Sequence, residues 1–203
     1  MNKALTKIFL IVCVLLGSAG VSSAADFQRG LAAHNRGDFR TALREWRPLA
    51  EQGDADSQYN LGLMYQLGQG VPQDDKAVVK WYKLAAEQGN ASAQYNLGLI
   101  YEMAQGVPQD YKAAVKWYRL AAKQGDVYTQ YRLGLMYHNG LGVPQNYIYA
   151  HMWANLAAAS GHKLAAKGRS DLEKRMSPDQ IAKAQRLATE CARKKYKGCE
   201  TKY

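Results

Sequence analysis

Ser160 is the best candidate for a nucleophile in this sequence. Ser160 and Lys163 are spaced as Ser-x-x-Lys, the pattern that sets a nucleophilic serine beside a lysine in penicillin-recognising enzymes. Ser170 and Asp171 begin the second motif of those enzymes, but Leu172 stands where an asparagine is needed, and the chain has no Lys-Thr-Gly element. Because such enzymes also need a β-sheet and the sequence shows no strand pattern, we interpret the match as chance and predict no catalytic residue.

Histidine and cysteine side chains, the usual zinc ligands, are scattered along the chain. The four histidines, at positions 34, 138, 151 and 162, form no closely spaced pair. Cys191 and Cys199 have no second pair of ligands beside them to complete a metal site. We therefore predict neither a metal ion nor a cofactor. The two cysteines either form a disulfide or remain separate thiols.

The first 25 residues differ from the rest of the chain. Lys3 and Lys7 precede an apolar run from Ile8 to Leu16, and small residues follow as far as Ala25. This order is typical of a cleavable secretory signal peptide, and the run is too short for a bilayer, which needs about 20 apolar residues. We expect residues 1–25 to be a signal peptide and the protein to be periplasmic or secreted, an oxidising setting in which cysteines can pair.

The net charge of +10 is concentrated near the C-terminus. Residues 26–162 are almost neutral, whereas residues 163–203 are strongly basic, with the densest patch at Arg193–Lys197. Export argues against nucleic acid as a partner. The basic end is interpreted first as a solubilising helix terminus, and second as a weak contact for anionic lipid or glycan.

Three segments of 36 residues, at 55–90, 91–126 and 127–162, repeat one another in register. The first two agree at most positions, and the third keeps the same Gly, Tyr, Leu and Trp framework. A fixed period of this length indicates a solenoid of stacked supersecondary units. The positions that could do chemistry must therefore be placed by the repeat.

Each repeat is expected to hold two antiparallel helices. In the first repeat, Asp54 would cap a helix over Ala55–Leu67, and Asp74 would cap a second helix that Gly89 ends. Gly62 recurs as Gly98 and Gly134 in mid-helix, where glycine costs about 1 kcal/mol, so we expect a close approach of the partner helix there. The predicted fold is all-α, an α/α superhelical solenoid.

These residues resemble the Sel1-like repeat, a longer relative of the tetratricopeptide repeat. Leu-Gly-x-x-Tyr, Gly-Val-Pro-Gln-Asp and Trp-Tyr-x-Leu-Ala-Ala-x-Gln-Gly carry the likeness. Residues 26–54 look like a degenerate N-terminal repeat, and 163–203 like a C-terminal helical cap. The resemblance implies a non-catalytic scaffold that binds proteins, here in the bacterial cell envelope. The alternative is an enzyme or binder that acts on peptidoglycan or β-lactams, as assigned to cysteine-rich relatives, but these repeats contain no cysteine.

The resemblance also implies that the first helix of each pair lines a concave binding face. Nine positions on these helices form a predicted partner-binding groove of tyrosines, leucines and one variable position per repeat: Tyr59, Leu63, Gln66, Tyr95, Leu99, Glu102, Tyr131, Leu135 and His138. Tyrosine offers contact area and a polar tip at low entropic cost. The competing interpretation is that some of these side chains belong to the core between repeats.

Overall fold

A computed structural model describes residues 24–199, which are helical or in turns and include no strand. The chain forms two compact units, Met1–Trp81 and Tyr82–Tyr203. The predicted signal peptide, residues 1–25, lies outside the described residues except for its last two positions. None of the helices described is long and apolar enough to cross a membrane.

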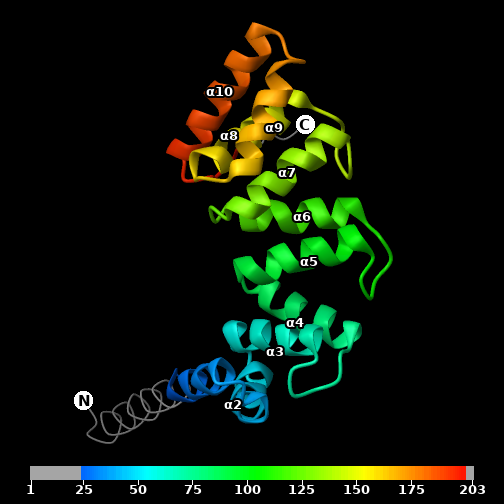
Figure 1. Ribbon diagram of the computed structural model, residues 1–203, viewed down its shortest axis with the longest axis vertical. Coiled ribbons are helices and arrows are strands. Elements are labelled where there is room, and N and C mark those ends of the chain that lie inside the picture. Colours follow the sequence, from blue (N-terminus) through cyan, green and yellow to red (C-terminus); the bar gives the residue numbers. More distant parts are fainter. Residues whose placement is uncertain (1–23, 200–203) are drawn as a thin grey trace, which may run out of the picture. The chain divides into compact units, whose positions relative to one another are not determined.

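Helices follow one another in pairs, joined by short turns (Figure 1). Residues 24–35 are helical and precede α2. The remaining helices are α2 (Phe39–Glu51), α3 (Ala55–Leu67), α4 (Asp75–Glu87), α5 (Ala91–Met103), α6 (Tyr111–Ala122), α7 (Val127–Asn139), α8 (Tyr147–Ala159), α9 (Lys163–Glu173) and α10 (Pro178–Arg193). The all-α prediction is confirmed, and α4 contains the boundary between the two units.

The repeated helix ends have local causes. Asp54, Asn90 and Asp126 cap α3, α5 and α7, because each side-chain oxygen accepts a hydrogen bond from a first-turn amide. At the other end, Gly68 and Gly140 adopt left-handed backbone conformations, with φ of 68° and 69°. These signals recur with the sequence period, so the repeat sets where each helix begins and ends.

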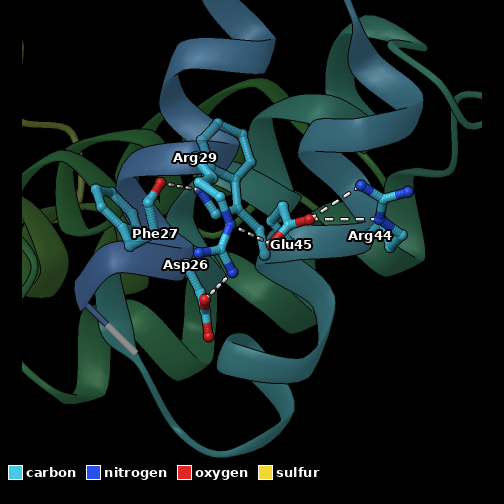
Figure 2. Close-up of polar contacts among 6 residues, drawn as sticks. Asp26, Phe27, Arg29, Arg44 and Glu45 are labelled. Carbon is cyan, nitrogen blue, oxygen red and sulfur yellow. Dashed lines mark hydrogen bonds and ion pairs between the residues drawn. The ribbon is translucent and has the colours of Figure 1, made fainter. Parts of the chain in front are cut away.

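The helix pair at the start of unit 1 combines an apolar cluster with a series of polar contacts, which Figure 2 shows. Trp46 in α2 is 1% exposed, and its indole nitrogen donates to the carbonyl oxygen of Phe27 at 3.2 Å. Arg29 pairs with Asp26 and, at 3.3 Å, with Glu45 of α2. Since these ion pairs are partly exposed, they add little, and this helix pair depends mainly on the apolar cluster in which Trp46 is buried with Ala33 and Ala42.

In unit 2, α5 packs on α6, α6 on α7, and α7 on α8, while α8 also contacts α9 and α10 (Figure 1). A continuous apolar core runs through these helices and includes Tyr118, Leu133, Met136 and Trp153. The second helix of one repeat also reaches the first helix of the next, as when Arg119 donates to the Tyr137 hydroxyl at 2.7 Å. Stacking therefore buries the faces that a single pair would expose.

Mid-helix glycines make room for aromatic rings. A Cβ added to Gly98 in α5 would overlap the Tyr118 ring of α6, and one added to Gly30 would overlap the ring of Trp46. Gly134 in α7 differs, since its added Cβ would meet the Ala150 carbonyl oxygen at 3.3 Å and no ring. The expected close approach of the partner helix is found at Gly134, whereas at Gly98 a side chain approaches.

The C-terminal segment folds as two helices and a returning turn. Ser177 and Gln180 form a reciprocal capping box at the start of α10, as their spacing predicts. Cys191 and Cys199 are joined by a disulfide, and both are buried in the core of unit 2. The turn between them places the Tyr196 ring against Gly125, near the end of α6.

The second helices bury only part of their apolar residues. Leu84 lies at helical spacing with Ala77, Trp81 and Ala85, but its side chain is 37% exposed, as is that of its repeat counterpart Leu120. Ala85 and Trp81 are buried. Only part of the repeated Leu-Ala-Ala segment therefore enters the core.

Gly98→Ala should destabilise the protein more than Gly134→Ala. The first change forces the buried Tyr118 ring to move, and overpacking of this kind costs about 1–3 kcal/mol. The second meets only a 3.3 Å contact, and the better helix propensity of alanine, worth about 1 kcal/mol, offsets it. Thermal unfolding followed by circular dichroism checks the order. Equal melting temperatures for the two variants would show that the ring is not seated on Gly98.

Candidate partner-binding groove

The structure leaves all nine predicted groove positions half-buried. In unit 1, α3 carries Tyr59, Leu63 and Gln66. In unit 2, α5 carries Tyr95, Leu99 and Glu102, and α7 carries Tyr131, Leu135 and His138. Tyr95 and Leu99 pack against the core of unit 2, as the competing interpretation held for some of these side chains. The remaining exposed surface of each position is what a partner can contact.

Glu102 is the centre of a polar network on α5. Its carboxylate accepts a hydrogen bond of 2.5 Å from the hydroxyl of Tyr118 and lies 3.3 Å from the guanidinium of Arg132. Burial, followed by the hydrogen bond to Glu102, raises the pKa of the Tyr118 hydroxyl far above its usual range. Burial alone would lower the pKa of Arg132, but the Glu102 carboxylate reverses this and the pKa is raised. Glu102 thus links α5, α6 and α7.

The three predicted positions on α7 open into a pocket. A cavity of about 420 Å³ is lined by Tyr131, Leu135 and His138 of α7, together with residues of α8 and α9. Its further lining residues are Gly134, Ala150, Ala154, Gly168, Asp171, Leu172, Lys174 and Arg175. The structure therefore brings one third of the predicted groove to a concave site and joins it to the C-terminal cap.

Aromatic and imidazole rings hold the α7 side of this pocket in place. Tyr131 stacks on His162, with ring centroids 4.5 Å apart, and His138 stacks on Tyr147 at 5.5 Å. His162 also caps α9, since its Nδ1 accepts the amide of Ala165. The pocket walls are thus fixed by contacts from outside the pocket, which favours a preformed site.

A buried histidine ties α8 to α9. His151 is wholly buried, and its Nε2 lies 2.9 Å from a carboxylate oxygen of Glu173. Arg169 lies 3.6 Å from the same oxygen of Glu173 and donates to the side chain of Asn155 at 2.7 Å. These contacts give His151 a structural role, and they orient the helix that carries the rim of the pocket.

The Ser-x-x-Lys segment lies at a helix junction. Ser160 is the exposed C-cap of α8, and Lys163 is the exposed first residue of α9. Ser170 uses its hydroxyl to hydrogen-bond the carbonyl oxygen of Ala166 within its own helix. Among the described residues, no three histidine, cysteine or acidic side chains gather as metal ligands would.

Sequence reasoning missed Tyr118, Arg132 and the α9 residues of the pocket. Arg132 replaces an asparagine that the first two repeats share, and Glu102 replaces the glutamine of the first repeat. The appearance of an acid and a base at these two positions was the sequence signal for the network of Glu102, Tyr118 and Arg132. The α9 rim had no such signal because residues 163–203 no longer follow the repeat. Its position depends on how α9 packs on α8.

Glu102→Ala should lower stability by about 1–3 kcal/mol, because the buried Tyr118 hydroxyl and the Arg132 cation both lose a partner. Urea unfolding followed by tryptophan fluorescence measures the loss. The matched control is Glu87→Ala, which removes an exposed pair with Lys83 at 4.0 Å and should change stability by less than about 0.5 kcal/mol. A Glu102 variant as stable as this control would exclude the network as a structural tie.

Comparisons with known proteins agree on the family. The Sel1 repeat profile matches residues 55–90, 91–126 and 127–162. A Sel1 repeat protein from Oxalobacter formigenes is similar over 74% of this chain and 45% of its own, with 35% identity and a TM-score of 0.69. The protective antigen c5321, present in uropathogenic Escherichia coli strains and displaying an SLR fold, is similar over 87% of this chain and 47% of its own, with 28% identity and a TM-score of 0.54.

This chain spans less than half the length of either of these structures. No protein with a curated description matches it. Proteins with Sel1 repeats are generally non-catalytic scaffolds for protein–protein interaction. Three consecutive repeats over more than half of the sequence, and a solenoid neighbour at 35% identity, identify the chain as a member of the Sel1 repeat family.

Proposed function

We propose that this protein is a non-catalytic scaffold that binds another protein in the bacterial cell envelope through the first helices of its repeats. The observation that carries the proposal is the α7 pocket, where Tyr131, Leu135 and His138 present part of their surface to a cavity of about 420 Å³. Side chains of this kind supply contact area in protein interfaces, and the pocket gives them a shape to recognise.

Export is part of the same proposal. The charged, apolar and small-residue order of residues 1–25 supports a signal peptide, and the Cys191–Cys199 disulfide fits an oxidising compartment. A structural relative described as a protective antigen also fits an exported protein. We place the protein in the periplasm or outside the cell.

The basic C-terminal segment contributes a second, weaker contact in this proposal. Arg193, Lys194, Lys195 and Lys197 are exposed, although Lys194 pairs with Glu190 at 2.5 Å. Such a patch attracts anionic lipid or glycan at low salt and loses that attraction as salt rises. In this proposal, the basic patch helps to hold the protein near an anionic surface and does not select the protein partner.

We propose no catalytic role because of where the candidate side chains lie. Ser160 and Lys163 end one helix and begin the next on the surface, and Ser170 hydrogen-bonds its own helix. Turnover of a chromogenic β-lactam that disappears with Ser160→Ala would contradict this part of the proposal.

Replacing Tyr95 and Tyr131 with alanine should weaken capture of the envelope partner at least about tenfold, the loss expected when interface tyrosines are truncated. Crosslinking in intact cells, followed by mass spectrometry, measures the partner recovered. Helicity should be preserved in circular dichroism, since both tyrosines are only half-buried.

The control for this experiment is Leu164→Ala. Leu164 is on α9, is 60% exposed and does not line the pocket, so its removal should leave capture unchanged. Undiminished capture by the folded Tyr95 and Tyr131 variant would remove the groove from consideration.

A further inference from the structure

One position of the second helix changes abruptly in the third repeat. This position is occupied by Trp46 in the degenerate repeat, by Tyr82 in the first repeat and by Tyr118 in the second, and each side chain is at most 1% exposed. In α8 the position is Ala154. The large ring that the repeat carries elsewhere is therefore missing from α8, although the mid-helix glycine, Gly134, is kept.

The space left by this ring is only partly closed. The α8 backbone approaches α7, since a Cβ on Gly134 would lie 3.3 Å from the Ala150 carbonyl oxygen and 3.5 Å from the Ala154 amide nitrogen. A pocket of about 420 Å³ remains, within the range of about 300–1,000 Å³ that ligand sites occupy. The α9 side is open too, because a Cβ on Gly168 would meet nothing within 4 Å.

The walls and the rim of this pocket have different chemistry. Tyr131, Leu135 and Leu172 line it with aromatic and aliphatic groups. At the rim, the Lys174 ammonium lies 2.8 Å from the Asp171 carboxylate, so these two charges neutralise each other. Arg175 is exposed and leaves the rim with a net positive charge. An apolar group with a neighbouring anion complements this arrangement.

We propose that the α7–α8–α9 pocket receives an aromatic side chain of a partner polypeptide, with a carboxylate of the same segment on Arg175. The partner's ring supplies to the third repeat the aromatic group that Tyr118 supplies to the second. The inference rests on the proposed scaffold function and names the kind of segment that the scaffold binds.

A titration of the full protein with three acetylated dipeptide amides tests the proposal. The probes are tyrosyl-aspartyl, tyrosyl-lysyl and leucyl-aspartyl amides, and the backbone amide signals of Gly134 and Gly168 are followed by NMR. We expect saturable shifts with tyrosyl-aspartyl amide at about millimolar concentration, the affinity that burial of one ring supports, and at least about threefold weaker binding of the other two. Equal binding of the leucyl probe would overturn the aromatic assignment, and equal binding of the lysyl probe would overturn the role of Arg175.

Two variants that fill the pocket complete the test. Gly168→Phe inserts a ring from α9 into open space, and Ala154→Tyr restores the residue of the preceding repeats. Each should weaken binding of tyrosyl-aspartyl amide at least about tenfold, whereas Gly168→Ala, which adds only a Cβ, should bind as before. Circular dichroism establishes which variants are folded. Unchanged binding by either folded filled variant would overturn the proposal.

Failure of the pocket assignment is distinguishable from failure of the scaffold function. If tyrosyl-aspartyl amide does not bind but the Tyr95 and Tyr131 variant still loses its crosslinked partner, the pocket assignment is wrong and the scaffold stands. If the probe binds at Gly134 and Gly168 while partner capture survives loss of both tyrosines, the pocket is supported and the scaffold role of this face is wrong.

Discussion

The packing of an aromatic ring on a mid-helix glycine is the interaction that joins the two helices at the start of unit 1 and the two helices of the second repeat. Gly98 admits the ring of Tyr118, and Gly30 admits that of Trp46. Glycine destabilises a helix by about 1 kcal/mol relative to alanine, but it lets a large ring pack against the neighbouring backbone. The ring is then buried away from solvent, which is favourable. These glycines are therefore sites of contact between the two helices of a pair, whereas successive pairs are joined by contacts such as that of Arg119 in α6 with Tyr137 in α7.

The same interaction explains where the structure departs from its own repeat. Ala154 removes the ring from the third pair, α8 moves close to Gly134, and a pocket remains between α7 and α9. In the preceding pair the corresponding space is filled by Tyr118, whose hydroxyl is held by Glu102 and, through it, by Arg132. Variation at a few positions thus converts a packed repeat into one with an open pocket, while the order of the helices is kept.

Much of the fold could be predicted because its signals are local. Asp54, Asn90 and Asp126 mark helix starts by capping chemistry that needs only a few neighbouring residues. The pocket could not be predicted in this way, because it depends on a side chain that is missing at Ala154 and on the placement of α9. The replacement of tyrosine by alanine is visible in the aligned repeats, but its meaning depends on the contact between Tyr118 and Gly98. Leu84 shows that helical spacing alone does not place an apolar residue in the core, since its side chain lies partly exposed.

We expect a protein partner to bind in the cell at the pocket on α7 of unit 2. A direct test replaces Asp171, an exposed residue at the pocket rim, with the photocrosslinking amino acid benzoylphenylalanine and irradiates intact cells. We expect a discrete crosslinked protein from position 171 and none from the same substitution at Leu164, which is 60% exposed and outside the pocket. No adduct at position 171, or the same adducts from both positions, would contradict the proposed binding face.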